Sequence, residues 1–320
     1  MLKTQVRIGQ GSLYLTQQFT YNNTCVRKAI WGDDMKATAV IEDFSALGTI
    51  SSVAAMDVLH GMGITTAVLP AMFLSSSTEG FGTPVKMTAS SWLRTTFAHW
   101  QTVSHLDLDS ALVGYLGKTS AISEVAALAT HNHWQTLLVD PVMGDNGRLY
   151  DGFGPDYPAQ MMELVKLATV ITPNWTELQL LIGEKPIQSD KSDQAIAKAV
   201  NKIRQGGLGA TIVVTGIHRR EQIGSLTFLP HKTIPFFTGN QPFPGHFYGT
   251  GDTFSALLVG YLQQGLSMTS AVSKSTAAIQ IAVAETAKLS PDDQDRVYGM
   301  KTRRLLNYLT TDENHHERLD

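Results

Sequence analysis

The sequence predicts an α/β domain with a mostly parallel, doubly wound sheet. Short runs rich in β-branched residues alternate with longer amphipathic stretches along most of the chain, which is the order of elements in such folds. Runs such as 137–140 (LLVD) and 212–215 (IVVT) are almost wholly apolar instead of alternating, as in strands that helices cover on both faces. No repeat or long low-complexity linker interrupts the pattern, so we expect one domain over residues 35–310.

Strands are expected where a short apolar run stops at a turn signal. In chain order they are 37–41, 65–69, 111–114, 136–140, 169–171, 211–215, 222–229 and 232–237. The last two are predicted to form a hairpin around Pro230 and His231.

Helices are expected where apolar residues recur every three or four positions. In chain order they are 50–62, 91–103, 120–130, 156–167, 176–182, 192–205, 250–264, 268–289 and 297–309. Serines can cap the second of these, and Gly206 with Gly207 ends the one that begins at 192.

The two ends of the chain do not share this pattern. Residues 1–34 keep no helical or strand period, and an ordinary start followed by a strand begins at Met35. We therefore expect 1–34 to be a disordered extension or a mis-called start, with a docked arm as the alternative. The charged residues 311–320 are expected to be a frayed tail.

Composition excludes several classes of protein. The 320 residues are 43% apolar and 17% charged, too apolar for a disordered chain. A net charge of −3 argues against a general nucleic-acid binder. The sequence contains no run of eighteen apolar residues, so it does not predict a membrane-spanning helix. The single cysteine, Cys25, cannot form an internal disulfide. We expect a cytoplasmic metabolic protein.

Ligands of open α/β sheets bind at the carboxyl ends of the strands, so polar residues there are candidates for a site. Gly249, Thr250 and Gly251 precede an apolar helix, and unpaired amides at a helix N-terminus attract anions. Asp252 follows directly, where a carboxylate can take a proton from an alcohol that attacks a phosphoryl group. The alternative is that Asp252 only caps the helix.

Three further strand ends carry polar residues. Asp140 and Asp145 follow one strand, and two carboxylates near a phosphate suit a hydrated Mg²⁺; alternatively, Asp140 caps a turn. Asn174 and Glu177 lie one helical turn apart, either facing one ligand or capping the next helix. Thr215 is expected to end a buried strand, where it either contacts a ligand or belongs to a simple turn. The chain has no GxxxxGK[ST], no GxGxxG after the first strand and no GxSxG, which excludes P-loop, Rossmann and hydrolase-elbow sites.

Four blocks together carry a family resemblance: GYLG (114–117), DPVMGD (140–145), ITPNWTEL (171–178) and GTGDTFSALLVGYL (249–262). With them the sequence resembles the ribokinase-like superfamily over about 38–290, in the branch of pyridoxal, pyridoxine and pyridoxamine kinases and the related hydroxymethylpyrimidine kinases. The resemblance implies a three-layer α-β-α fold with a mostly parallel central sheet, and a homodimer. A sugar kinase is less favoured, because Glu42 leads within about eight residues to an expected helix, without a lid insert.

The activity that the resemblance implies is ATP-dependent phosphorylation of the 5′-hydroxymethyl group of a B6 vitamer, in vitamin B6 salvage. The alternatives are a hydroxymethylpyrimidine (phosphate) kinase of thiamine synthesis and a non-catalytic vitamin-binding protein. ATP and Mg²⁺ are the implied cofactors, with a monovalent cation such as K⁺ as a further candidate. No nucleic acid or membrane partner is expected.

The resemblance also implies roles for single residues. Asp252 would be the general base, and Gly249, Thr250 and Gly251 the anion hole. The residues near ATP and Mg²⁺ would be Asp140, Glu177, Asn174, Thr215 and Asp145, of which Asp140 and Glu177 would serve the metal. The residues near the vitamin would be Ser45, Thr78, Tyr115 and Tyr150, the last of these matching the tyrosine of the loop that closes over ATP.

The chain departs from the pyridoxal kinase pattern only around the vitamin. Ala46 stands where a histidine is common, and in LSSSTEGF (74–81) Ser77 and Gly80 replace a histidine and a tyrosine. Loss of two ring side chains weakens stacking on a pyridine ring. The phosphate-binding blocks are intact, so these changes concern the choice of substrate.

Overall fold

The computed structural model describes residues 35–104, 106–187, 191–232, 234–291 and 293–311. The predicted extension 1–34 lies outside the described residues, as does the predicted tail beyond Thr311.

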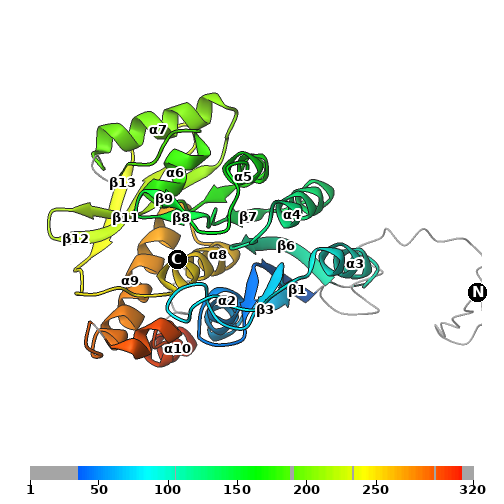
Figure 1. Ribbon diagram of the computed structural model, residues 1–320, viewed down its shortest axis with the longest axis horizontal. Helices are drawn as coiled ribbons and strands as arrows, with labels where there is room; N and C mark the ends of the chain where they lie inside the picture. Colours follow the sequence, from blue (N-terminus) through cyan, green and yellow to red (C-terminus); the bar gives the residue numbers. More distant parts are fainter. Residues whose placement is uncertain (1–34, 105, 188–190, 233, 292, 312–320) are drawn as a thin grey trace, which may run out of the picture. The chain divides into compact units, whose positions relative to one another are not determined.

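A mostly parallel sheet forms the centre of the molecule, as predicted. Among the described residues it has eight strands in the order β13-β12-β11-β10-β7-β6-β1-β3 (Figure 1). The strands are β1 (Met35–Ile41), β3 (Thr65–Val68), β6 (Leu106–Val113), β7 (Thr136–Val139), β10 (Val170–Ile171), β11 (Thr211–Arg219), β12 (Gln222–Phe228) and β13 (Phe236–Asn240). The pairs β1–β3, β6–β7, β7–β10 and β10–β11 are parallel. β12 and β13 add an antiparallel edge next to β11.

Helices cover both faces of this sheet, which gives the predicted three layers (Figure 1). One layer contains α2 (Ser51–Gly61), α8 (Thr250–Gln263), α9 (Met268–Thr286) and α10 (Arg303–Thr310). The other contains α3 (Ser90–Trp100), α4 (Thr119–His131), α5 (Tyr157–Val165), α6 (Trp175–Leu181) and α7 (Asp193–Gln205). Among the described helices, none is both long and apolar enough to cross a bilayer.

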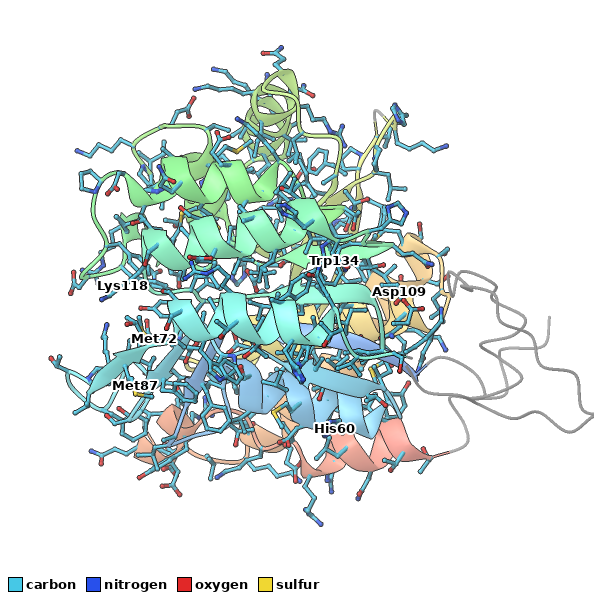
Figure 2. The ribbon with its side chains drawn as sticks, turned by 90° about the vertical axis from the view of Figure 1, so that its right-hand side faces the viewer. His60, Met72, Met87, Asp109, Lys118 and Trp134 are labelled. Atoms are coloured by element: carbon cyan, nitrogen blue, oxygen red, sulfur yellow. The ribbon has the colours of Figure 1, made fainter. Side chains whose placement is uncertain are left out.

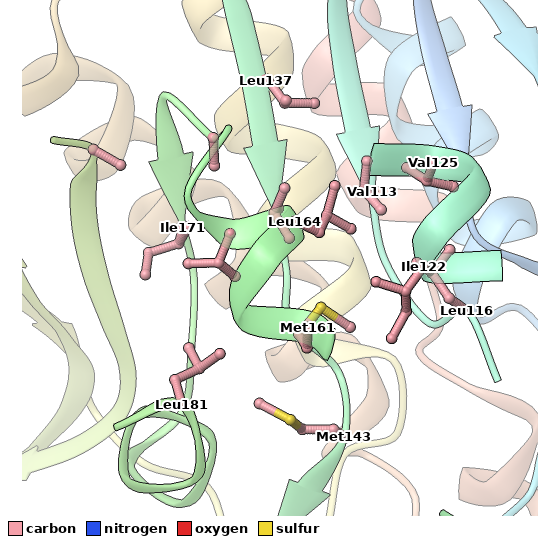
Figure 3. Close-up of a cluster of buried hydrophobic side chains, with 14 of the residues drawn as sticks. Val113, Leu116, Ile122, Val125, Leu137, Met143, Met161, Leu164, Ile171 and Leu181 are labelled. Carbon is pink, nitrogen blue, oxygen red and sulfur yellow. The ribbon is translucent and has the colours of Figure 1, made fainter. Parts of the chain in front are cut away.

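The strands are apolar throughout because successive side chains enter different layers. In β7, Leu137 and Val139 pack toward α3–α7, whereas Leu138 packs toward α2 and α8. Figure 3 shows the first of these clusters, whose members include Leu137, Leu164 of α5 and Ile171 of β10. Full burial of one such side chain contributes about 1.5–3 kcal/mol.

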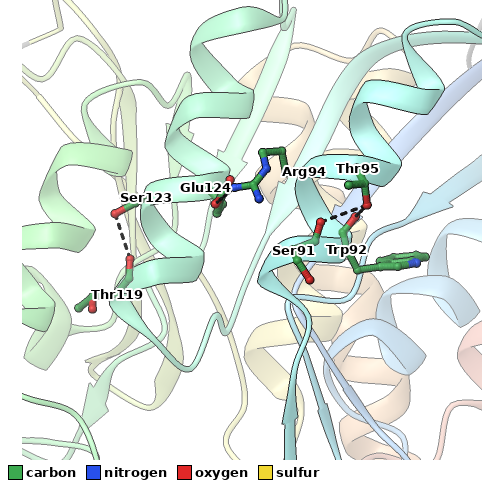
Figure 4. A network of polar contacts seen from close by, with 7 residues as sticks. All are labelled: Ser91, Trp92, Arg94, Thr95, Thr119, Ser123 and Glu124. Carbon is green, nitrogen blue, oxygen red and sulfur yellow. Dashed lines mark hydrogen bonds and ion pairs between the residues drawn. The ribbon is translucent and has the colours of Figure 1, made fainter.

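Polar contacts between the outer helices contribute less to the stability of the fold than this apolar packing. Arg94 of α3 donates to Glu124 of α4 at 2.6 Å (Figure 4). The Arg94 side chain is 62% exposed, and exposed pairs of this kind are worth about 0–1 kcal/mol. Apolar packing therefore holds these helices to the sheet.

A small second sheet was not predicted. It consists of β2 (Asp43–Ser45), β4 (Met72–Leu74) and β5 (Lys86–Thr88); Met72 and Met87 lie on the same side of the molecule in Figure 2. Strands of three residues are too short to show a period. β2 therefore lies between Glu42 and the helix expected soon after it, α2, which begins at Ser51.

Other element boundaries also differ from the prediction. β11 continues past 215 through a bulge after Val214. β13 begins at Phe236 instead of 232, because Pro235 has no amide to donate to the ladder. The helix predicted over 297–309 is confirmed only from Arg303 onward, as α10. Its predicted start is wrong: a 3-10 turn, η1 (Gln294–Tyr298), precedes α10, since Gly299 at φ +97° leaves the helical region.

Candidate active site

The carboxyl ends of β1, β7, β10 and β11 meet the N-terminus of α8 around a cavity of about 610 Å³. Every site residue that the sequence singled out lines this cavity. They are Ser45, Thr78, Tyr115, Asp140, Asp145, Tyr150, Asn174, Glu177, Thr215, Gly249, Thr250, Gly251 and Asp252. Placement in one cavity is a fact of the structure, whereas the roles of these residues remain predictions.

The loop before α8 is shaped to receive an anion. Gly249 is the N-cap in the left-handed region at φ +78°, where a Cβ would lie 3.1 Å from Ile50 Cγ2. The Thr250 hydroxyl donates to the Phe247 carbonyl at 2.6 Å and fixes the turn. The first amides of a helix have no carbonyl partner within it and lie at the positive end of its dipole. The amides of 249–251 are therefore placed where negative charge is favoured, and their role as an anion hole stays a prediction.

The Asp252 carboxylate is held by a backbone amide of another segment and does not cap α8. The Ser51 amide donates to Asp252 Oδ2 at 2.8 Å, and no side chain caps α8, so the capping alternative is wrong. Ser51 itself has φ +48° at the start of α2, a conformation that costs a non-glycine residue energy and often marks functional sites. Burial raises the pKa of Asp252, although the Ser51 amide opposes the shift.

Asp140 lies near the anion loop. Its Oδ2 accepts from the Ser255 hydroxyl at 3.0 Å, and Ser255 meets Thr172 at 3.1 Å. The Cβ position of Gly251 is 3.7 Å from Asp140 Oδ2. Burial and, after it, the charge of Asp252 raise the pKa of Asp140 to about 7.

Asn174 and Glu177 form a capping box at the start of α6. The Glu177 amide donates to Asn174 Oδ1 at 2.9 Å, and the Asn174 amide donates to Glu177 Oε2 at 2.9 Å. The Met143 amide donates to Glu177 Oε1 at 3.1 Å. The capping interpretation is thus confirmed, yet Glu177 also borders the cavity; burial and the charge of Asp140 raise its pKa well above the usual range.

Asp145 and Tyr150 flank a tight hairpin over the cavity. β8 (Gly144–Asp145) pairs with β9 (Arg148–Leu149). Between them Asn146 at φ +54° and Gly147 at φ +77° make the turn. Burial and the charge of Glu177 raise the pKa of Tyr150, so its hydroxyl stays protonated.

The end of the cavity near β2 combines an aromatic wall with hydroxyl groups. Tyr115 lies 5.5 Å from Phe153, which stacks on Tyr157 at 3.9 Å. Ser45 donates to Asp43 Oδ2 at 2.9 Å. Ser77 Oγ donates to the Glu79 carbonyl at 2.7 Å, so it shapes the loop that carries Thr78.

Sequence reasoning missed several residues that support the site. Ser255 follows Asp252 by three positions, on one helix face, and that spacing was a usable signal. Asp43 and Ser51 gave no signal, because β2 was not predicted and Ser51 acts through its backbone. Glu42 was missed as well; it is 1% exposed, and only a glycine at 114 leaves room for it.

The cavity fits a hydrated divalent cation with few protein ligands. Six carboxylates line it and, among the described lining residues, no lysine or arginine does. The described part of the chain holds no cluster of three metal-ligating side chains, whereas Mg²⁺ usually keeps several waters and takes one or two carboxylates. Asp140 and Glu177 can supply those two.

The metal-free protein is expected to lose stability as pH rises from about 4 to 7. Burial raises the pKa of both Asp43 and Asp140 to about 7, from about 3.9 in an unfolded chain. Between these values the folded state binds more protons, so its unfolding free energy falls with rising pH. The Tm of D43N should be a few degrees above that of wild type at pH 8 and close to it at pH 4. A change of about 1 kcal/mol in the free energy of unfolding shifts Tm by 2–4 °C in a domain of this size class. Thermal unfolding without metal measures this; an equal difference at both pH values would contradict it.

Comparison with known proteins identifies the family. A family model, phosphomethylpyrimidine kinase, matches residues 50–295. The crystal structure of pyridoxal kinase from Lactobacillus plantarum is 34% identical, covers 88% of this chain and 98% of its own, and superposes with a TM-score of 0.79.

The curated relatives include proteins named as pyridoxal kinases and proteins named as hydroxymethylpyrimidine/phosphomethylpyrimidine kinases. Pyridoxal kinase of Rubrobacter xylanophilus is 30% identical over 56% of this chain, which spans 62% of that protein's length. Hydroxymethylpyrimidine/phosphomethylpyrimidine kinase of Haemophilus influenzae is 33% identical over 56% of this chain and 67% of its own. With this fold and these matches, the chain belongs to the phosphomethylpyrimidine kinase family and resembles the pyridoxal kinases of the ribokinase-like superfamily.

Proposed function

We propose that the protein is an ATP-dependent kinase that phosphorylates the 5′-hydroxymethyl group of a B6 vitamer. One observation carries this proposal: Asp252, fixed by the Ser51 amide, stands beside the anion loop 249–251 in the cavity whose other end has the Tyr115 wall. A base and an anion site in one cavity suit transfer of a phosphoryl group to an alcohol.

Asp252 would accept the proton of the attacking hydroxyl group. A general base works best with a pKa near the operating pH, and burial moves the pKa of Asp252 upward. The Ser51 amide orients Asp252 Oδ2, which supports a fixed direction for the proton transfer. The amides of 249–251 would stabilise charge on the transferred group where it develops.

Asp140 and Glu177 would hold Mg²⁺, which neutralises charge on the triphosphate. Six carboxylates, with no lysine or arginine among the described lining residues, would repel a bare triphosphate, and this supports the need for the cation. A monovalent cation such as K⁺ belongs to the same proposal and is tested by titrating KCl in the assay.

The end of the cavity near β12 and α9 suits the nucleotide. Ile223 lines it from β12, and Ile279 and Val283 line it from α9, which supports an apolar slot for a flat base. Thr215 and Asn174 are bridge partners that line the same cavity, and they would contact ATP. Asp145 and Tyr150, beside the hairpin turn, would close over the nucleotide.

The vitamin would bind between Ser45, Thr78 and Tyr115. Burial and the charge of Asp43 raise the pKa of Tyr115 to about 12, so it offers a neutral ring. Because Ser77 and Gly80 replace ring side chains, Tyr115 would supply aromatic contact there.

A substrate panel tests the proposal. ADP formation is measured with pyridoxal, pyridoxine, pyridoxamine, hydroxymethylpyrimidine and its phosphate, each with MgATP. We expect the highest kcat/KM with a B6 vitamer and no turnover after chelation of Mg²⁺. Saturable binding without transfer would select the vitamin-binding alternative.

The second candidate is a hydroxymethylpyrimidine kinase. The matching family model and the Haemophilus influenzae relative favour it, as does the loss of ring side chains at 77 and 80. A higher kcat/KM with hydroxymethylpyrimidine than with every B6 vitamer would establish this alternative.

We also propose a cytoplasmic homodimer. An apolar row supports the dimer: Phe44, Phe73 and Met87 are register partners on one face of the small sheet, and Met87 is 61% exposed. Cytoplasmic ATP supply supports the location. Light scattering should give twice the chain mass; the mass of a single chain would contradict the dimer.

A further inference from the structure

Arg296 of η1 is a charged residue that is only 2% exposed. Burial of a charge is costly unless the group is paired or hydrogen-bonded. Its guanidinium donates from Nη1 to the Pro244 carbonyl at 3.0 Å and from Nη2 to the Leu289 carbonyl at 2.7 Å. Cζ lies 4.6 Å from the centre of the Phe247 ring. One side chain thus joins the chain after α9 to the segment 244–247.

That segment leads directly into the anion loop. The Phe247 carbonyl, two residues before Gly249, accepts the Thr250 hydroxyl at 2.6 Å. Gly245 has φ +96°, and a Cβ there would clash with the Arg296 guanidinium. A shift of 244–247 would therefore pass to Thr250 and to the amides of 249–251.

The same 3-10 turn also supports the base. The Thr49 amide donates to the Tyr298 carbonyl at 2.6 Å, and Thr49 forms a bridge with Gly299. Two residues later the Ser51 amide holds Asp252. η1 therefore contacts both segments that place the reacting groups, one through Arg296 and the other through its backbone.

We propose that Arg296 is a positioning residue for phosphoryl transfer. It does not line the cavity; it acts by holding the segment 244–247 and, through it, the anion loop. This inference rests on the proposed kinase function. A planar guanidinium reaches two carbonyls at once and covers an aromatic ring, which a lysine ammonium cannot reproduce.

The test compares R296A and R296K with wild type in the full chain. R303A is the matched control, because Arg303 lies on α10 with 78% of its side chain exposed. We expect kcat to fall about 10²-fold in both Arg296 variants, as for a misplaced reacting group. KM for ATP and for the vitamin should stay within about threefold of wild type, and R303A should match wild type.

Methylguanidine separates positioning from a purely structural role. Added to R296A, it should raise kcat about tenfold or more, because it can refill the site of the lost guanidinium. Folded Arg296 variants with wild-type kcat would overturn the inference, as would methylguanidine that restores Tm without kcat. If R296A does not fold, the kcat of folded R296K tests the inference by the same criterion. A wild type that transfers no phosphoryl group would instead contradict the proposed function.

Discussion

D252N is expected to lower kcat by about 10²–10⁴-fold, the usual worth of a general base. An asparagine oxygen can still accept the Ser51 amide, so the loop geometry should persist. Binding of ATP should be little changed, because the substitution removes a proton acceptor and leaves the amides of 249–251 in place. Steady-state kinetics and nucleotide titration measure the two quantities separately.

The same substitution should raise the Tm of the metal-free protein. Asp252 is one of the charges that raise the pKa of Glu42, Asp43 and Asp140, so its removal relieves repulsion among buried carboxylates. Loss of activity with a gain of stability is typical of functional residues. A D252N variant with near-normal kcat would remove Asp252 from the role of base.

D140N is expected to lower kcat about 10²-fold or more at moderate Mg²⁺. A neutral amide holds a divalent cation more weakly, so the Mg²⁺ concentration for half-maximal rate should rise at least about tenfold. Tm without metal should rise, since burial and the charge of Asp252 disfavour the Asp140 carboxylate. Rates across a Mg²⁺ titration, with Tm on the same samples, measure both effects.

S255A is the matched control for this prediction. It removes the hydroxyl that donates to Asp140 Oδ2 but keeps the carboxylate. Its Mg²⁺ requirement should lie between wild type and D140N. If D140N responds to Mg²⁺ as wild type does, Asp140 does not serve the metal.

Long, strongly periodic elements were predictable from sequence. The alternation of apolar strands with amphipathic helices identified the three layers, and the predicted helix over 192–205 matches Asp193–Gln205 within one residue. Elements of two or three residues such as β2 escaped prediction, because no period shows over so short a run. The Gly299 break escaped for another reason: the apolar pattern continues across it, and only the backbone dihedral shows the interruption.

The candidate site was predictable in so far as it depends on strand ends. Parallel strands bring their carboxyl ends to one edge of a sheet, so Asp140 and Asn174 had to gather there. Thr215 lies within β11, at the bulge after Val214, and does not end the strand as predicted. Ser51 and Arg296 escaped for a different reason. Ser51 acts through a backbone amide, and Arg296 acts on carbonyls of residues 7 and 52 positions away, so neither leaves a motif.

The sequence by itself determined the fold class, the family resemblance and the anion-binding loop with its carboxylate, because these depend on local periods and on residues adjacent in the chain. Only the tertiary structure decided that Asp252 does not cap its helix. It also decided that burial raises the pKa of five carboxylates, that a neighbouring carboxylate raises four of these further, and that η1 supports both halves of the site. These properties depend on distance and burial between segments up to about 200 residues apart, such as Ser51 and Asp252, and Coulomb energy follows spatial distance, not sequence separation.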